Sequence, residues 1–286
     1  MTGAPAKTAS GPDPGHGPGS AVAAPVVAAP QWRIDTDRRA AARTALAAGA
    51  DELHLDYGGA HRGPPLSDPV ALRAAEAVTR QLPVPVLAVN HLNDIGLAHE
   101  EGVPDAAAVD LLRHALDCAR RLGVGVLHVP GFRRSRPDSA GVRAGTVAAL
   151  REVCAELTGT DPLIAYESPL DARASLALAR AVDHPALRLV LDTGNLCDAG
   201  VRPLDFAEEV AAAGLLLPDL HVKDGSGTTA PSAGDLPALV RACGARSVLV
   251  ENDYRQTPAR LREDIALCRR TTITRPLKEA PSKEAP

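Results

Sequence analysis

The sequence has few aromatic residues and lacks several motifs that would assign a function directly. Phe, Trp and Tyr make up 2% of the 286 residues, so Ala, Leu and Val must fill the hydrophobic core. No GxGxxG turn follows the first predicted strand and no P-loop occurs, which argues against a nucleotide-binding open sheet. No segment approaches the ~18 consecutive apolar residues of a membrane helix, so no membrane association is expected.

The cysteine count and the net charge argue against two further classes of protein, disulfide-bonded proteins and nucleic-acid-binding proteins. The five cysteines are an odd number without a CxxC pair, which predicts reduced thiols in a cytoplasmic protein rather than a disulfide framework. A formal net charge of -4 lacks the basic excess that is typical of nucleic-acid-binding proteins. We therefore expect no nucleic-acid partner.

The two ends of the chain differ in composition from the middle. Residues 1–30 are rich in Gly, Pro, Ala and Ser, and they cannot bury enough apolar surface to offset the entropy of ordering. The apolar stretch SAVAAPVVAAP is interrupted by proline, which argues against a secretion signal. We predict a disordered segment at 1–30, a single domain at 31–271 and a disordered tail at 272–286.

Between the two ends, short β-type runs alternate with longer segments of helical period. Strict alternation requires crossover connections and hence a parallel sheet. Eight such units are the size of a closed (β/α)8 TIM barrel, an α/β fold, and an open doubly wound sheet is the competing architecture. The predicted strands are 32–36, 52–57, 85–90, 123–129, 162–167, 187–192, 216–222 and 247–251.

The last four predicted strands each deliver one polar residue at or near the carboxyl end, where barrel enzymes have their active sites. These residues are Glu167, Asp192, His221 and Glu251. Three converging carboxylates would repel one another, and a divalent cation would remove that repulsion and account for the histidine. The oxygen-rich ligand set suits Mn²⁺, Mg²⁺ or Co²⁺, and Zn²⁺ is an alternative.

The stretches around these residues resemble the xylose isomerase-like TIM barrel superfamily, which contains sugar and sugar-phosphate isomerases and epimerases. They read IAYESP, LVLDTGN, LHVKDG and VLVEND, in that order. The resemblance implies one divalent metal ion, Mn²⁺ first, held by Glu167, Asp192, His221 and Glu251. It also implies that Glu167 and Glu251 are the catalytic acid/base pair. The expected reaction moves a proton next to the carbonyl of a small polyhydroxylated ketone or aldehyde through a metal-stabilised enediolate.

Two departures from this family pattern bear on the substrate. Many members have a histidine where this chain has Asn195, and asparagine can bind a hydroxyl group but is a poor metal ligand. Sugar epimerases often carry an arginine in the loop after HVKDG, and here that loop reads SGTTAPSAGD. A phosphorylated substrate is therefore expected only if Lys223, Arg133 or Arg134 binds the phosphate.

Other polar residues at the predicted strand ends could line a pocket for a polyol. His54 lies in ELHLDYGG, Asn90 ends the third predicted strand, and His128 precedes a turn in LHVPGF. With Asn195 and Lys223, they form the predicted substrate-binding set.

Three alternatives to an isomerase or epimerase remain open at this point. A dehydratase that acts on an inosose-like or dehydroshikimate-like cyclic ketone begins with the same proton abstraction. A barrel that binds a ligand without catalysis is a second alternative. An abasic-site endonuclease is a third, and the net charge and Asn195 argue against it. Barrels of this kind often form homodimers, although no sequence feature marks an interface.

Overall fold

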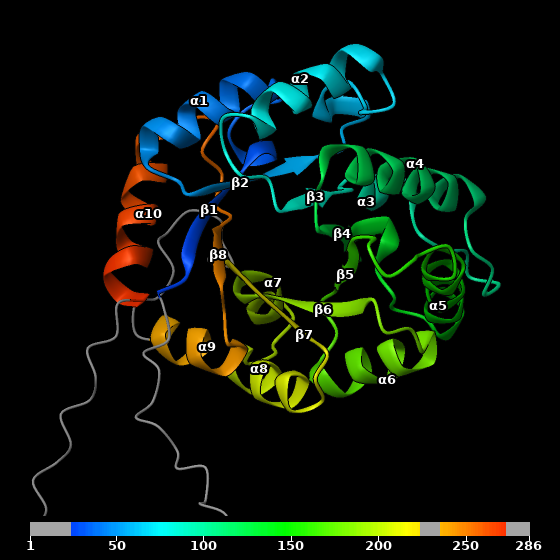
Figure 1. The fold of residues 1–286 in the computed structure, drawn as a ribbon. Coiled ribbons are helices and arrows are strands. Elements are labelled where there is room, and N and C mark those ends of the chain that lie inside the picture. Colours follow the sequence, from blue (N-terminus) through cyan, green and yellow to red (C-terminus); the bar gives the residue numbers. More distant parts are fainter. Residues whose placement is uncertain (1–23, 224–234, 273–286) are drawn as a thin grey trace, which may run out of the picture.

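The computed structural model describes residues 24–223 and 235–272, which form a barrel of parallel strands surrounded by helices (Figure 1). The strand order is β1 to β8 in sequence, and β1 pairs with β8 to close the barrel. This confirms the predicted (β/α)8 fold. Among the described residues, no helix is both long and apolar enough to cross a membrane.

The strands are short and register with their neighbours in parallel. Asp192 on β6 lies opposite His221 on β7, and Pro130 on β4 lies opposite Glu167 on β5, so the carboxyl ends of these strands share one rim. The bounds are β1 Val26–Pro30, β2 Glu52–Asp56, β3 Val86–Ala88, β4 Val126–Pro130, β5 Leu163–Glu167, β6 Leu187–Asp192, β7 Leu216–Val222 and β8 Ser247–Val250.

The prediction was wrong about the first strand. Residues 31–33 form a short 3-10 helix, η1 (Gln31–Arg33), and β1 lies within the segment that was expected to be disordered. The run VVAAP resembles a low-complexity stretch because its residues are small and end in proline. Pairing with β2 on one side and β8 on the other stabilises it, and Pro30 is tolerated at the strand end. The rest of the predicted N-terminal segment (1–23) and the C-terminal tail beyond residue 272 lie outside the described residues.

The outer helices are α1 Arg38–Ala48, α2 Pro69–Thr79, α4 Ala106–Leu122, α5 Ala140–Cys154, α6 Ala172–Val182, α8 Pro203–Ala212, α9 Leu236–Cys243 and α10 Pro258–Thr272. Several begin after an Asp or Ser whose side chain accepts a hydrogen bond from the first turn; these are Asp37, Asp68, Asp105, Ser139 and Asp171. Short helices follow the strands at the rim: η2 Ala60–Arg62, α3 Leu92–Ile95, η3 Arg133–Ser135 and α7 Thr193–Asp198.

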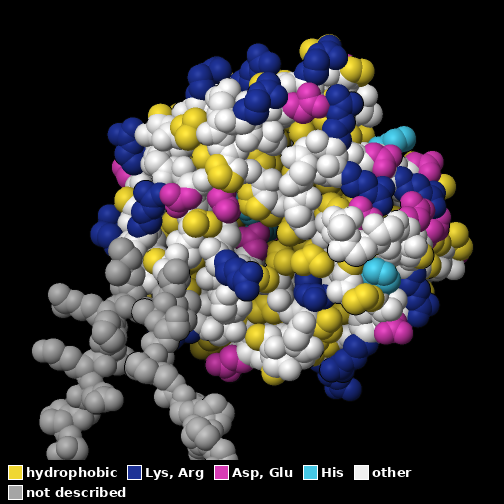
Figure 2. Space-filling view, viewed as in Figure 1, with side chains coloured by type: hydrophobic (Ala, Val, Ile, Leu, Met, Phe, Trp, Pro, Cys, Tyr) yellow, Lys and Arg dark blue, Asp and Glu magenta, His cyan; other side chains and the backbone are white. Residues whose placement is uncertain are grey.

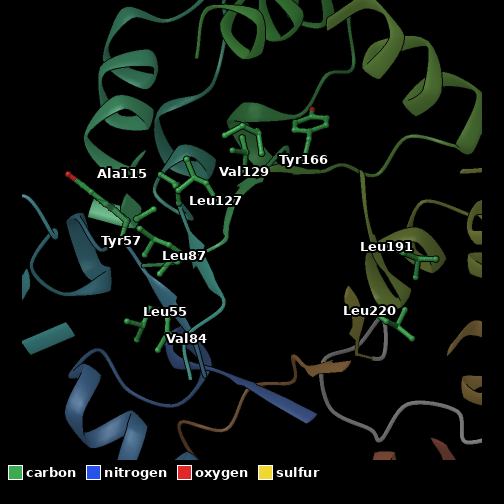
Figure 3. Packing of buried hydrophobic residues seen from close by; sticks show 14 of the residues in the cluster. Leu55, Tyr57, Val84, Leu87, Ala115, Leu127, Val129, Tyr166, Leu191 and Leu220 are labelled. Atoms are coloured by element: carbon green, nitrogen blue, oxygen red, sulfur yellow. The ribbon is translucent and has the colours of Figure 1, made fainter. Parts of the chain in front are cut away.

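Alternate residues of each strand face opposite sides of the barrel wall. The outward residues pack beneath the helices, as Figure 3 shows for Leu55, Leu87 and Leu127. Inside the barrel, Ala165, Val190 and Leu217 form a separate small apolar cluster. The inward positions nearer the rim carry polar residues, which places the functional site inside the carboxyl end of the barrel.

Candidate active site

The four predicted metal ligands meet at the rim. Glu167 and Asp192 end β5 and β6, and His221 is the penultimate residue of β7. Glu251 directly follows β8, and its N–H donates to the carbonyl of Val222 at 3.0 Å, which continues the strand ladder. All four residues are buried. The structure therefore brings together side chains from four different strands.

Asp192 uses its two carboxylate oxygens differently. Oδ1 accepts a hydrogen bond from the backbone N–H of Asn195 at 2.7 Å and thereby caps α7. Oδ2 is buried without a hydrogen-bond partner among the described residues, and it lies 3.0 Å from the ammonium nitrogen of Lys223. One oxygen thus stabilises the strand-to-helix turn, while the other faces the cluster of charges.

His221 lies between the two glutamates. Its Nδ1 is 3.4 Å from Oε2 of Glu167 and 3.5 Å from Oε2 of Glu251. On the other side of the ring, Nε2 is 3.7 Å from Oδ2 of Asp219, which precedes His221 by two residues on the same face of β7. The ring is thus oriented by carboxylates at both nitrogens, an arrangement common around metal-ligating histidines.

Different donors hold the two glutamates. Oε2 of Glu167 is 2.7 Å from Nε2 of His128, and Oε1 accepts a hydrogen bond from the side-chain amide of Asn195 at 2.6 Å. Oε1 of Glu251 accepts from the indole N–H of Trp32 at 3.1 Å. Two cations lie near Glu251, since Lys223 Nζ is 3.6 Å from its Oε2 and Arg33 Nε is 3.8 Å from its Oε1. Both carboxylates are therefore fixed in position before any ligand binds.

Burial and neighbouring charges separate the acidities of the three carboxylates. Burial opposes ionisation of Glu167, but the hydrogen bonds of His128 and His221 outweigh it and hold its pKa below the usual range. Burial also opposes ionisation of Glu251, where Lys223 and His221 lower the pKa well below normal. At Asp192 burial prevails over the ammonium of Lys223 and raises the pKa to about 7. Asp192 is thus the carboxyl group that exchanges its proton near neutrality.

The cluster fits a divalent cation. One possible ligand set is Asp192, His221 and Glu251, and a second is His128, Glu167 and His221; within each set the ligand atoms lie within 4.8 Å of one another. Asp192 Oδ2, His221 Nδ1 and Glu251 Oε2 are buried and make no hydrogen bond within the described part of the chain. Such atoms are costly to bury unless a cation or a ligand binds them. His221 belongs to both sets, and together the two sets contain all four predicted ligands.

A pocket of about 270 Å³ opens onto the two glutamates. Its buried lining includes Asn90, His128, Glu167 and Glu251, and Asn195 and Lys223 also line it. Figure 2 shows acidic side chains within a hollow at the centre of this face, with Lys or Arg side chains nearby. Four of the five predicted substrate-binding residues therefore reach the pocket: Asn90, His128, Asn195 and Lys223.

The structure does not bring the fifth residue, His54, to the pocket. Its side chain is fully buried inside the barrel, with Nε2 3.8 Å from Oδ2 of Asp219. Burial lowers the pKa of His54 to about 4, so the ring is neutral at physiological pH. His54 thus supports the residue that orients His221 and lies outside the substrate pocket.

Several site residues were missed from the sequence. Asp219 could have been found, because a strand period of two places it on the same face as His221. Trp32 was assigned to a strand, yet it lies in η1 and reaches Glu251 across the barrel closure. Arg62 lines the pocket from η2, a short rim helix that no periodicity marked.

Comparisons with known proteins agree with the fold. The profile of the xylose isomerase-like TIM barrel family matches residues 42–255. A 2-epi-5-epi-valiolone 7-phosphate 2-epimerase from Actinoplanes sp. (strain ATCC 31044 / CBS 674.73 / SE50/110) is 35% identical over 257 residues, which cover 85% of this chain and 93% of that protein.

Solved structures share the fold at low sequence identity. A D-allulose 3-epimerase from Methylomonas sp. superposes with a TM-score of 0.65 at 16% identity and covers 86% of this chain and 98% of its own. A xylose isomerase-like TIM barrel protein from Mycobacterium smegmatis, in complex with magnesium, gives a TM-score of 0.63 at 12% identity, with 86% and 96% covered. The chain therefore belongs to the xylose isomerase-like TIM barrel family and is an enzyme of the isomerase and epimerase kind.

Proposed function

We propose that the protein is a divalent-metal-dependent epimerase that inverts a carbon next to the carbonyl group of a small polyhydroxylated ketone. The observation that carries this proposal is the placement of two buried glutamates, Glu167 and Glu251, in one pocket, where each has an oxygen within 3.5 Å of Nδ1 of His221. The Actinoplanes relative, an epimerase by name, supports the same reaction class. The substrate is a small molecule, and the net charge of -4 gives no reason to expect a nucleic-acid partner.

The metal ion would be held by Glu167, Asp192, His221 and Glu251. When bound, it supplies a Lewis acid that stabilises negative charge on the substrate's carbonyl oxygen. Mn²⁺ is our first choice, since the ligand set is rich in oxygen, and Mg²⁺, Co²⁺ and Zn²⁺ are the alternatives. Lys223 places a positive charge between Asp192 and Glu251, and this pairing supports the proposal that the same carboxylates can bind a cation.

We assign Glu251 as the base. Lys223, His221 and Arg33 keep its carboxylate ionised, and an ionised carboxylate can accept the proton from the substrate's C–H bond. The electron pair of that bond is then delocalised as an enediolate. Trp32 holds the second carboxylate oxygen of Glu251 and fixes the direction of attack.

Glu167 then returns a proton to the opposite face of the same carbon. Its partner His128, whose Nε2 lies 2.7 Å from Oε2 of Glu167, is the adjacent group that can relay this proton. Asn195 keeps the other oxygen of Glu167 in place and cannot itself transfer a proton. The cycle ends when Glu251 releases its proton to solvent and His128 regains one.

Incubation in D2O tests this proposal. Wild-type protein loaded with Mn²⁺ should convert 2-epi-5-epi-valiolone 7-phosphate to its 2-epimer with one deuterium incorporated at the inverted carbon, measured by NMR. A conjugated-enone absorbance would instead identify a dehydratase. Neither exchange nor turnover with metal-loaded protein, across phosphorylated and unphosphorylated polyhydroxylated ketones, would favour a non-catalytic barrel.

A further inference from the structure

One side of the pocket carries a cluster of basic side chains that the proposed chemistry does not use. We name Arg62, Arg133 and His61 the basic rim; all three line the same pocket as Glu167 and Glu251. His61 and Arg62 come from η2 after β2, and Arg133 comes from η3 after β4. The basic rim is thus built by loops of the first half of the barrel.

A single carboxylate, Asp94 on α3, holds the two arginines of the basic rim. Arg62 Nη2 lies 2.9 Å from one oxygen of Asp94 and 3.1 Å from the other. Arg133 Nη1 lies 3.4 Å from Oδ1 of Asp94. Two guanidinium groups against one carboxylate leave a net positive charge, and Nε of Arg62 is buried without a hydrogen-bond partner among the described residues.

Each of the other two arginines that line the pocket has its own carboxylate partner. Arg255 is paired with the carboxylate of Asp253, where its Nε donates at 2.9 Å. Arg33 faces the catalytic carboxylate of Glu251 at 3.8 Å. The uncompensated positive charge of the pocket therefore lies at the basic rim, away from the glutamate that we assign as the base.

The backbone of the basic rim is held in an unfavourable conformation. Ala60 and Arg133 adopt φ angles of 46° and 49°, in the left-handed region that non-glycine residues rarely adopt. Such conformations persist where the surrounding structure enforces them, and they are frequent at ligand clamps. Ala60 begins η2 and Arg133 begins η3, so the strained residues lie in the two short helices that carry the basic rim.

We propose that the basic rim binds a phosphate monoester on the substrate, while the ketone end reaches Glu167 and Glu251. This rests on the proposed function and deepens it by naming the substrate class, a phosphorylated polyhydroxylated ketone. Guanidinium groups match the geometry and charge of phosphate oxygens through paired hydrogen bonds. The arginine that is absent from the loop after β7 is thus replaced from loops after β2 and β4. Of the arginines named from the sequence, Arg133 lines the pocket and Arg134 is not among its lining residues.

Paired substrates test the proposal. Initial rates are measured for 2-epi-5-epi-valiolone 7-phosphate and for the same ketone without its phosphate, using wild type, Arg62→Gln, Arg133→Gln and the neighbouring control Arg134→Gln. For the phosphorylated ketone, each rim variant should raise KM by about tenfold or more, as the loss of a charge-assisted hydrogen bond predicts. The unphosphorylated ketone and the control variant should show wild-type KM. Equal losses on both ketones, or no loss on either, would overturn the proposal.

Binding of inorganic phosphate separates this proposal from the proposed function. Calorimetric titration of phosphate into Mg²⁺-loaded protein should give a signal that both rim variants weaken and Arg134→Gln preserves. If neither ketone is turned over but phosphate binding still depends on Arg62 and Arg133, the anion site stands and the proposed function fails. If both ketones are turned over equally and phosphate does not bind, the anion site fails and the function stands. Rim-dependent phosphate binding without any preference for the phosphorylated ketone would assign the site to free phosphate and overturn the monoester proposal.

Discussion

The two halves of the barrel contribute different kinds of residues to one pocket. Strands β5 to β8 deliver Glu167, Asp192, His221 and Glu251, which are buried and lie within the strand ends or, for Glu251, directly after one. The half from β1 to β4 contributes Arg62 and Arg133 from short helices beyond the strands. Rigid strand ends suit a metal and proton transfer, while rim loops can vary and so suit recognition of the rest of a substrate.

The largest loss of activity should follow a substitution in the second half of the barrel, β5 to β8. Glu251→Gln removes the proposed base but keeps the shape of the side chain, so turnover should fall by about 10³-fold while the thermal transition remains cooperative. The exposed Glu263→Gln on α10 is a matched control and should behave as wild type. Steady-state kinetics and circular dichroism provide the measurement. Turnover within a factor of a few of wild type would remove Glu251 from the mechanism.

Metal affinity should depend steeply on pH because protons occupy the same ligands. The pKa of Asp192 is raised to about 7 and that of His221 is raised by Asp219 and the glutamates, against the effect of burial. The proton on His221 must be displaced wherever it is bound, and below pH 7 the proton on Asp192 must be displaced as well, so the affinity should fall about tenfold more steeply per pH unit below pH 7 than above it. Titration with Mn²⁺ from pH 5.5 to 8.5, with the break sought at about 7, checks this expectation. A pH-independent affinity would contradict it.

A substitution of Asp219 tests whether the orientation of the His221 ring contributes to metal affinity. Asp219→Asn removes the charge that lies 3.7 Å from Nε2 of His221 and should weaken metal binding by about 10–100-fold, the usual cost of losing such a partner. Asp205→Asn on α8 is the control, because Asp205 is partly exposed and does not line the pocket. Equilibrium dialysis of the three proteins gives the ratio. An unchanged affinity for Asp219→Asn would make this residue purely structural.

His54, from the first half, should affect stability more than activity. Its pKa is about 4 in the folded protein against an ordinary value of 6.5, so the unfolded chain binds the proton more readily. The contribution of neutral His54 to stability should therefore be complete above pH 6.5, and this contribution should fall by about 3 kcal/mol as the pH drops towards 4. In His54→Gln this part of the pH dependence should vanish, and kcat/KM should change less than in Asp219→Asn. Urea unfolding at several pH values shows the difference; an identical pH dependence would contradict it.

The sequence predicted the second half better than the first for a physical reason. An apolar strand that ends in a single polar residue, such as LRLVLD before Thr193, fits a barrel in one way, with the apolar residues in the wall and the polar residue at the rim. The convergence of Glu167, Asp192, His221 and Glu251 followed from that alignment alone. Their roles as metal ligands and acid/base pair remain a proposal.

The first half gave weaker signals. Strand β1 consists of small residues and proline, and only its pairing with β2 and β8 distinguishes it from a linker. Arg62 and Trp32 reach the pocket from 3-10 turns, where no periodicity fixes the direction of a side chain. Their positions depend on tertiary contacts such as the ion pair of Arg62 with Asp94.

The hydrogen bond between Trp32 and Glu251 gives the protein an internal optical probe. Trp32 is the single tryptophan of the chain, and its indole N–H contacts a carboxylate that we expect to bind metal. Any ion or substrate that draws Glu251 away changes the charge beside that indole, and with it the fluorescence of the whole protein. Occupancy of the site can therefore be followed in real time by intrinsic emission, without a label or a coupled assay.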